Sequence, residues 1–303
     1  MKNKVYSGID KILCGTASDK LTDGCMVLEG GAFRGVYTEG VLDYLMKQDI
    51  NMQCTIGVSA GALNAANYVA GQIGRSARTN LTYRHNNDYV GLGAIKKNDG
   101  IIGFDFLYGD LDKIDPLDKT RLFDPSRKLV AVVTNLQNGK TEYMDRDNCG
   151  DFFQAIRASA SMPFVSKPVY IDDIPYLDGA CSCKTPYKWA LENGYEKIII
   201  IKTREDSYRK PPEKPETAKL CRAVYHNFPE FAESLSKSNT IYNDECDEIE
   251  KLKKEGRVFV ISPSKPVDVG KLEPDMEKLG ELYFFGVEDA KRNIEELKRY
   301  LEK

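Results

Sequence analysis

The chain has 303 residues, of which 42% are hydrophobic and 29% charged, with a formal net charge of -3. This balance lacks the basic surplus typical of nucleic-acid-binding proteins, so we expect no nucleic-acid partner. The longest apolar runs, such as KIIIIK at 197–202, are far shorter than the roughly 20 residues of a membrane span, and residues 1–15 lack the apolar core of a signal peptide. We therefore expect a cytoplasmic protein whose contact with membranes is transient and peripheral.

Strand-like and helix-like stretches alternate along the whole chain. Continuous apolar and β-branched runs predict buried strands at 25–30, 53–59, 127–136, 197–203 and 257–262. The helical periodicity between these runs predicts crossover helices, which join parallel strands. The expected fold class is therefore α/β, a three-layer α/β/α sandwich with a mostly parallel central sheet.

We predict one domain over residues 1–303. Residues 73–124 are rich in Tyr, Asn, Asp and Gly with weak periodicity, and we interpret them as a lid or cap insertion. Residues 218–303 predict C-terminal helices plus one strand. Within them, residues 287–303 predict a solvent-facing terminal helix with charge pairs four residues apart.

The eight cysteines form no CxxC pair, and we expect free thiols. Cys181 and Cys183 stand one residue apart beside Asp178-Gly179, the arrangement to inspect for metal or redox chemistry. Because no second cysteine pair or neighbouring histidine accompanies them, we predict no metal site and no cofactor.

The stretch IGVSAGALNAAN at 56–67 places Ser59 between Gly57 and Gly61 in a GxSxG motif. It follows a predicted strand and precedes a predicted helix, the context in which this motif presents a nucleophile on a sharp turn. Small flanking residues leave room for such a turn, although they would also suit a helix packed tightly against the sheet. A helix that begins at Ala60 brings free N–H groups beside the Ser59 oxygen.

A second turn, EGGAFRG at 29–35, also lies between a predicted strand and a predicted helix. Consecutive Gly30 and Gly31 allow successive backbone N–H groups to face one point, as an oxyanion hole requires. The alternative, a nucleotide phosphate loop, fits neither GxxxxGK[ST] nor GxGxxG, because Val36 follows Gly35 and Ala32 stands where a glycine belongs.

The third motif is YLDGACS at 176–182, which ends a hairpin-like stretch. An Asp-Gly pair usually marks a turn, and Asp178 alone would be interpreted as a turn residue. Next to a nucleophilic serine, however, the same carboxylate is a candidate base.

These three motifs in this order resemble those of the patatin-like phospholipase family, most closely its bacterial branch. The resemblance covers about residues 25–203, including IRASASMPFVSKPVYIDDIPYLDGA. It implies an α/β/α enzyme that cleaves acyl esters of lipids through a Ser-Asp dyad, as phospholipases A and lysophospholipases do, without histidine, metal or cofactor. The positions carried over are the nucleophile Ser59, the base Asp178, an oxyanion hole around Gly30, Gly31, Ala32, Arg34 and Ala60, and the motif glycines Gly35, Gly57, Gly61 and Gly179.

One residue departs from the family pattern, because Ala32 stands where a third glycine is usual. An alanine can still offer its N–H to the hole if its φ is negative. Arg34 has two interpretations: it contacts a phosphate or carboxylate of the substrate, or it ties neighbouring loops together.

Several alternatives remain open at this stage. The chain contains two histidines, His85 and His226, and an α/β-hydrolase-type esterase would use His226 as its base. A catalytically weak or inactive binding scaffold, and acyl transfer in place of hydrolysis, fit the same motifs. The expected partner is a lipid or other acyl-ester substrate, with apolar residues of 89–108 as candidates for its acyl pocket, and the oligomeric state is not predicted.

Overall fold

The structure is a computed structural model that describes residues 4–302. Its main sheet comprises β2 (Thr22–Leu28), β3 (Met52–Val58), β5 (Lys128–Asn135), β6 (Thr141–Met144), β7 (Val169–Ile171), β8 (Ile174–Asp178), β9 (Ile198–Ile201) and β10 (Phe259–Ile261). The strand order is β10-β9-β2-β3-β5-β8-β7, with β6 also paired to β5. The pairings from β10 to β5 are parallel, and β6, β7 and β8 are added antiparallel. A separate short pairing joins β1 (Gly15–Thr16) to β4 (Gln72–Ile73).

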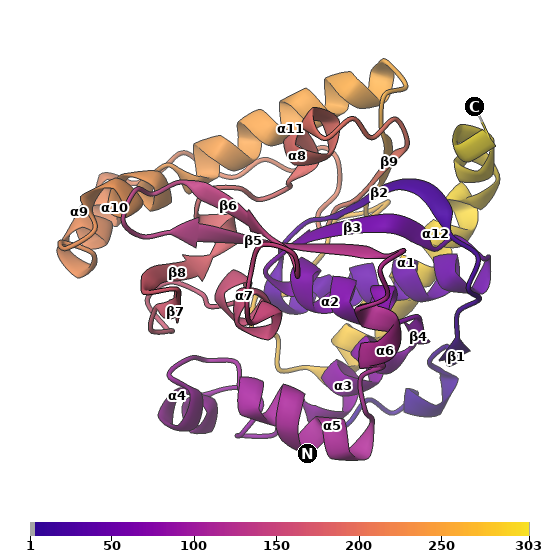
Figure 1. The fold of residues 1–303 in the computed structure, drawn as a ribbon, viewed down its shortest axis with the longest axis horizontal. Coiled ribbons are helices and arrows are strands. Elements are labelled where there is room, and N and C mark those ends of the chain that lie inside the picture. The colour runs from indigo at the N-terminus through magenta and orange to yellow at the C-terminus, as the bar shows by residue number, and fades with distance from the viewer. Residues whose placement is uncertain (1–3, 303) are drawn as a thin grey trace.

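Helices cover both faces of this sheet (Figure 1). One face carries α1 (Gly35–Lys47), α2 (Ala60–Val69), α7 (Phe152–Ser159) and α12 (Met276–Glu302), and the other carries α8 (Tyr187–Glu192) and α11 (Ser238–Lys254). The remaining helical segments are α3 (Arg75–Tyr83), α4 (Leu92–Asn98), α5 (Leu111–Ile114), α6 (Lys119–Leu122), α9 (Pro215–Val224), α10 (Pro229–Ser236), and the short turns η1 (Ile9–Lys11), η2 (Ala32–Arg34), η3 (Phe106–Asp110) and η4 (Gly179–Cys181). The predicted three-layer α/β/α fold is confirmed.

The central strands are buried on both faces, which explains their unbroken apolar sequences. In β9, Ile199 and Ile201 belong to the core beneath α1, α2 and α12, whereas Ile198 and Ile200 belong to the core beneath α8 and α11. All four side chains are fully buried. Because neighbouring residues of a strand point to opposite faces, a sheet covered by helices on both sides needs apolar residues at every position.

The terminal helix differs from its prediction. It begins at Met276 and packs along α1, so that Ala290, Ile294 and Leu297 are buried and only its outer face is in solvent. The two backbones approach closely: a Cβ on Gly286 would lie 2.1 Å from the Tyr37 carbonyl oxygen. The expectation of a solvent-facing helix was wrong because the charge pattern describes only the exposed half of this helix.

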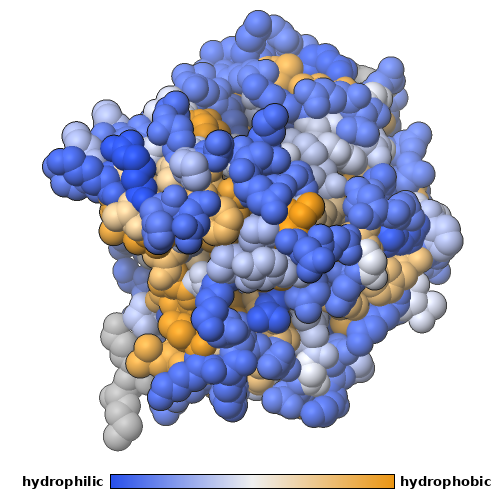
Figure 2. Space-filling model, turned by 60° about the vertical axis from the view of Figure 1, so that its left-hand side comes forward, coloured by the Kyte–Doolittle hydropathy of each residue, from blue (hydrophilic) through white to orange (hydrophobic). Residues whose placement is uncertain are grey.

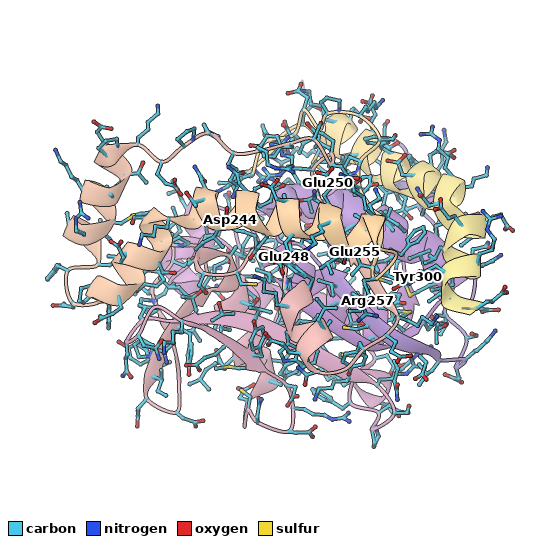
Figure 3. All side chains as sticks on the ribbon, turned by 90° about the horizontal axis from the view of Figure 1, so that it is seen from above. Asp244, Glu248, Glu250, Glu255, Arg257 and Tyr300 are labelled. Carbon is cyan, nitrogen blue, oxygen red and sulfur yellow. The ribbon has the colours of Figure 1, made fainter. Side chains whose placement is uncertain are left out.

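The opposite face carries the acidic helix α11, which crosses the sheet (Figure 3). Asp244, Glu248 and Glu250 are exposed along it, and Glu248 pairs with Lys188 of α8 at 2.8 Å. These carboxylates are a solvated outer surface of the sandwich.

Residues 73–124, the cap segment, contain α3 to α6. The helices α3, α4 and α5 lie outside the α1 and α2 layer, on the side away from the sheet (Figure 1). Figure 2 shows that the molecular surface is mostly polar, with apolar side chains gathered in bands on the face in view. Among residues 4–302, no helix combines the length and apolar character that a bilayer crossing demands.

Candidate active site

Ser59 occupies a strained turn between β3 and α2. Its backbone angles are φ 57° and ψ -125°, which a residue with a Cβ rarely adopts. The space around the turn requires glycine on both sides: a Cβ on Gly57 would lie 2.4 Å from the Gly61 carbonyl oxygen, and a Cβ on Gly61 would lie 2.6 Å from that of Leu28. The small residues of the GxSxG motif therefore serve the turn itself.

Asp178 reaches Ser59 from the end of β8. The Ser59 hydroxyl donates a hydrogen bond of 2.7 Å to Asp178 Oδ2 across 119 residues of sequence. The other carboxylate oxygen, Oδ1, accepts the Ala180 amide at 2.8 Å. Ser59 and Asp178 are 6% and 3% exposed, so the bond is shielded from water. An alcohol in direct contact with a buried carboxylate is an arrangement suited to nucleophilic catalysis.

The environment of Asp178 makes it a stronger base than an exposed aspartate. Burial raises the pKa of its carboxyl, because the charged form loses its hydration. The hydrogen bonds from Ser59 and Ala180 oppose this shift, as do the charges of Lys184 and Lys271. The net direction is upward, which increases proton affinity.

The amides of the glycine-rich turn divide into two groups. Those of Gly30 and Arg34 already donate to the carbonyl oxygens of Lys184 at 3.4 Å and Gly31 at 3.2 Å. Among residues 4–302, the amides of Gly31, Ala32 and Ala60 have no acceptor within the chain. The set of amides available to an oxyanion is thus narrower than the sequence suggested, and it excludes Gly30 and Arg34.

Ala32 does not have the negative φ on which its role was conditional. Its φ is 50°, in the left-handed region that favours glycine. The alanine accepts this backbone strain in the place where the family pattern has glycine, and its amide stays unbonded in the described chain. The sign of φ therefore does not decide whether the N–H is available.

A pocket opens beside the Ser59 hydroxyl, and it contains about 820 Å³ of space free of atoms, part of it open to solvent. Leu63, Met162 and Leu272 contribute apolar surface. The cap segment supplies another part of the wall, including Tyr89, Ile102, Leu107, Tyr108 and Leu117. Residues of the stretch 89–108 thus line the pocket, as the sequence suggested.

Neither histidine contacts the pair. His85 and His226 are exposed. A ring nitrogen of His85 is within hydrogen-bonding distance of the Pro274 carbonyl oxygen, and one of His226 is within hydrogen-bonding distance of the Ala223 carbonyl oxygen. Within residues 4–302, the side-chain partner of the Ser59 hydroxyl is Asp178. The geometry does not support His226 as the base.

Comparison with known proteins agrees with this fold and these motifs. Residues 26–191, more than half of the chain, match the family model described as Patatin-like phospholipase. The chain belongs to this family. The patatin-like chain also matches, over residues 228–302, a model described as Domain of unknown function (DUF6363). That region includes β10, which pairs with β9 and so extends the same sheet.

Two further proteins resemble this patatin-like chain. The uncharacterized protein YjjU of Escherichia coli (strain K12) is 26% identical over 266 residues, which cover 86% of this chain and 74% of the relative. The crystal structure of VipD from Legionella pneumophila superimposes with a TM-score of 0.47 at 13% identity, covering 98% of this chain and 71% of the other. The match to the family model, by itself, assigns the chain to a family of lipid acyl hydrolases.

Ser159, at the end of α7, supports the patatin-like turn and was missed by the sequence analysis. Its hydroxyl accepts the Ser59 amide at 3.0 Å, and it is fully buried. Two residues later, the Ser161 carbonyl accepts the Asp178 amide at 2.9 Å. One segment therefore holds the backbones of both Ser59 and Asp178. The small residues of RASAS gave no signal of this contact, because it depends on the packing of α7 against β3 and β8.

One end of the patatin-like pocket is polar, which the sequence did not predict. The buried carboxylate of Glu39 accepts hydrogen bonds from Asn80 at 2.6 Å and Ser76 at 3.2 Å. Burial raises the pKa of Glu39 to about 8. At neutral pH the Glu39 carboxyl is therefore mostly protonated.

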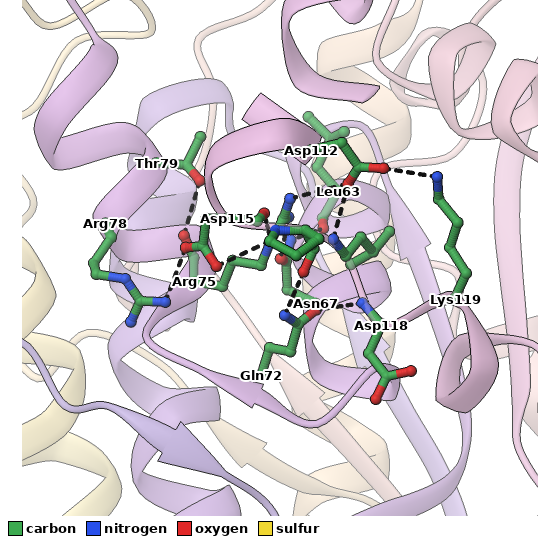
Figure 4. A network of polar contacts seen from close by, with 12 residues as sticks. Leu63, Asn67, Gln72, Arg75, Arg78, Thr79, Asp112, Asp115, Asp118 and Lys119 are labelled. Atoms are coloured by element: carbon green, nitrogen blue, oxygen red, sulfur yellow. Dashed lines mark hydrogen bonds and ion pairs between the residues drawn. The ribbon is translucent and has the colours of Figure 1, made fainter. Parts of the chain in front are cut away.

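A network around Arg75 of α3 connects the cap segment to α2 and joins α3 to residues 112–119 within the segment (Figure 4). The Arg75 guanidinium donates to Asn67 Oδ1 at 2.9 Å and lies 3.6 Å from Asp112 and 3.9 Å from Asp115. Lys119 also pairs with Asp112, at 2.7 Å. Because Arg75 and Leu117 both line the pocket, the network determines the shape of its wall.

Replacing Arg75 with alanine is expected to lower the free energy of unfolding by about 2–4 kcal/mol, because two aspartates lose a largely buried partner. Arg78→Ala is the matched control, since Arg78 pairs with Asp115 but its side chain is 36% exposed. We expect that control to cost less than about 1 kcal/mol. Urea denaturation measures both, and equal losses would contradict the role assigned to Arg75.

The two cysteines beside Asp178-Gly179 are not joined to each other. Cys181 is buried, Cys183 is partly buried, and both are free thiols. Within residues 4–302, no group of three or more His, Cys, Asp or Glu side chains is arranged to hold a metal ion.

Proposed function

We propose that this protein is a serine acyl hydrolase that cleaves carboxylic ester bonds of lipids through a Ser59-Asp178 dyad and an acyl-enzyme. The observation that carries the proposal is the 2.7 Å hydrogen bond from the Ser59 hydroxyl to the buried Asp178 carboxylate. The family match and the apolar pocket beside Ser59 support lipid esters as the substrate class. Transient contact with a lipid surface belongs to the same proposal.

In the first half-reaction, Ser59 Oγ attacks the ester carbonyl carbon while its proton moves to Asp178 Oδ2. The carbonyl oxygen becomes an oxyanion, which the free amides of Gly31, Ala32 and Ala60 stabilise. When the tetrahedral intermediate collapses, the ester C–O bond breaks and the leaving alcohol takes the proton from Asp178. The acyl group remains on Ser59.

In the second half-reaction, water attacks the acyl-enzyme. Asp178 accepts a proton from this water, the Ser59 Oγ–carbonyl bond breaks, and the proton returns to Ser59. A carboxylate is a weak base toward an alcohol, so its raised pKa and the electrostatic stabilisation of the oxyanion share the work of lowering the barrier. An acceptor alcohol in place of water would give acyl transfer by the same steps.

A fluorophosphonate probe and a lipid panel test this function together. The probe should modify Ser59, identified by peptide mass spectrometry, and fatty acid should be released from at least one of a phospholipid, a lysophospholipid, a diacylglycerol or a short-chain ester. Labelling at a different serine would contradict the proposed nucleophile. Absence of labelling together with absence of fatty-acid release would favour a binding scaffold with this fold.

A further inference from the structure

A second cavity lies beside the dyad, on the other side of the glycine-rich turn. It contains about 300 Å³ of space free of atoms, part of it open to solvent. One carboxylate, that of Glu29, lines it together with four basic side chains. The basic residues are Arg34, Lys184, Arg204 and Lys210. The family mechanism uses none of these side chains as nucleophile or base.

Two of these cations form no direct ion pair within residues 4–302, although the carboxylate of Glu29 lies among them. Arg34 is partly buried, yet its side chain makes no hydrogen bond or ion pair with residues 4–302, and its Nε is fully enclosed. The Lys210 ammonium lies 4.5 Å from the centre of the Tyr242 ring and pairs with no carboxylate in the same range. Oε1 of the Glu29 carboxyl accepts the Thr203 hydroxyl at 2.7 Å, whereas Oε2 has no hydrogen-bond partner among residues 4–302.

A fifth cation, Lys271, is an exposed residue whose backbone packs on the glycine-rich turn. Its carbonyl oxygen accepts the Phe33 amide at 3.2 Å, and the next residue, Leu272, lines the pocket of Ser59. Gly30 lines the cationic cavity and also touches the nucleophile, because a Cβ on it would lie 3.2 Å from Ser59 Cβ. An ester bound at Ser59 would thus have its alcohol portion within reach of these charges.

The charges of the cluster act on one another. Burial lowers the pKa of Lys210 to about 7, and the neighbouring Lys184, Lys271 and Arg34 contribute to this shift by repulsion. Loss of hydration lowers the pKa of Lys271, and repulsion from Lys184 and Arg34 lowers it further. Glu29 opposes the shift at Lys210 and Asp178 opposes the shift at Lys271, and an anion bound among the cations would reduce the repulsion that remains.

We propose that the basic residues of this cavity, Arg34, Lys184, Arg204 and Lys210, together with Lys271, bind the phosphate of the ester substrate, and that they select a headgroup that carries no compensating cation. A phosphomonoester lipid meets this condition, whereas a choline lipid brings its own positive charge. This inference rests on the proposed function, and it deepens that function by naming the headgroup class. Arg34 and Lys184 lie within residues 26–191, which match the family model, whereas Lys210 and Lys271 lie outside them.

Three substrates with the same acyl chains test the selectivity: dioctanoyl phosphatidate, dioctanoyl phosphatidylcholine and dioctanoylglycerol, all used as monomers. The Lys210→Gln/Lys271→Gln double variant should lower the ratio of kcat/KM for phosphatidate over dioctanoylglycerol by about 10- to 100-fold, mainly through KM, because charge-assisted contacts to phosphate are lost. Lys219→Gln, an exposed lysine on α9, is the matched control and should leave the ratio unchanged. A ratio that the double variant does not change, with dioctanoylglycerol still hydrolysed, would overturn the inference.

A binding measurement separates this inference from the proposed function. In a Ser59→Ala background, calorimetry should detect tighter binding of dioctanoyl phosphatidate than of dioctanoyl phosphatidylcholine, and the two lysine substitutions should remove the difference. This experiment needs no turnover, so an inactive enzyme would defeat the proposed hydrolysis and still leave the headgroup preference to be decided. If inorganic phosphate binds in a lysine-dependent manner and the two lipids bind equally, the cluster is a site for free phosphate and the substrate inference is wrong.

Discussion

Replacing Ser59 with alanine should reduce ester hydrolysis by about 10⁴- to 10⁶-fold, because no other group can form the acyl-enzyme. The residual rate would come from the oxyanion-stabilising amides and from substrate binding. The fold should persist, since alanine retains the Cβ and the Ser59 amide keeps its bond to Ser159. Fatty-acid release and circular dichroism on the same preparation measure both expectations.

Ser182→Ala is a suitable control for this experiment. Ser182 stands four residues after Asp178 in the sequence. Its hydroxyl lies 2.9 Å from the Thr134 hydroxyl and 2.7 Å from the Thr141 hydroxyl, and it forms no hydrogen bond with Ser59. We expect its activity to stay within a few-fold of the unmodified chain, whereas the Ser59 variant should be inactive and unlabelled by the fluorophosphonate. Full hydrolysis by the Ser59 variant would end the dyad proposal.

Asp178→Asn should lower kcat by about 10³- to 10⁴-fold, because the amide can still accept a hydrogen bond from Ser59 but cannot take its proton. Asp173→Asn is the matched control: it removes a carboxylate from the same hairpin, its side chain is exposed, and its φ of 62° suits asparagine equally well. Rates for the two variants on one ester provide the comparison. Comparable losses in both would indicate a general effect of hairpin charge.

The raised pKa of Asp178 gives the same experiment a pH readout. The base must be ionised, so kcat/KM should fall as pH decreases through a value above the ordinary aspartate range, and the residual rate of Asp178→Asn should lack this acid limb. A folded-state pKa above the unfolded one penalises the folded state at pH above both values, and the penalty vanishes below both. The asparagine variant should therefore have an equal or higher Tm at neutral pH. A lower Tm would indicate that the carboxylate stabilises the fold.

Much of the fold could be predicted from local sequence. The run of four isoleucines in β9 predicts a strand buried on both faces, and the structure buries all four side chains. The predicted strand at 25–30 is β2, although it ends at Leu28 because the chain turns at Glu29 and Gly30. The terminal helix shows the limit of such patterns. Its charges predict a helix but do not reveal that Gly286 meets the α1 backbone.

The candidate site, too, could be predicted from the sequence only in part. Glycine spacing within five residues predicts the turn at Ser59, because the clash that excludes a Cβ involves Gly57, Gly61 and the adjacent strand. Sequence alone left Asp178 with two interpretations, as a turn residue or as a base, and the resemblance favoured the base. The supporting hydroxyl of Ser159 had no sequence signal, and Lys210 and Lys271 were not recognised as neighbours of the dyad.

The sequence by itself determined the α/β class and the strained serine turn, since these depend on periodicity and sterics over a few neighbouring residues, whereas the role of Asp178 as the acid came from the family resemblance. Only the tertiary structure decided that the acid lies 2.7 Å from the serine, which amides remain free, and which cations gather beside them. Those distances depend on the order of strands in the sheet and on the packing of α7 and the C-terminal segments. No local pattern encodes these arrangements.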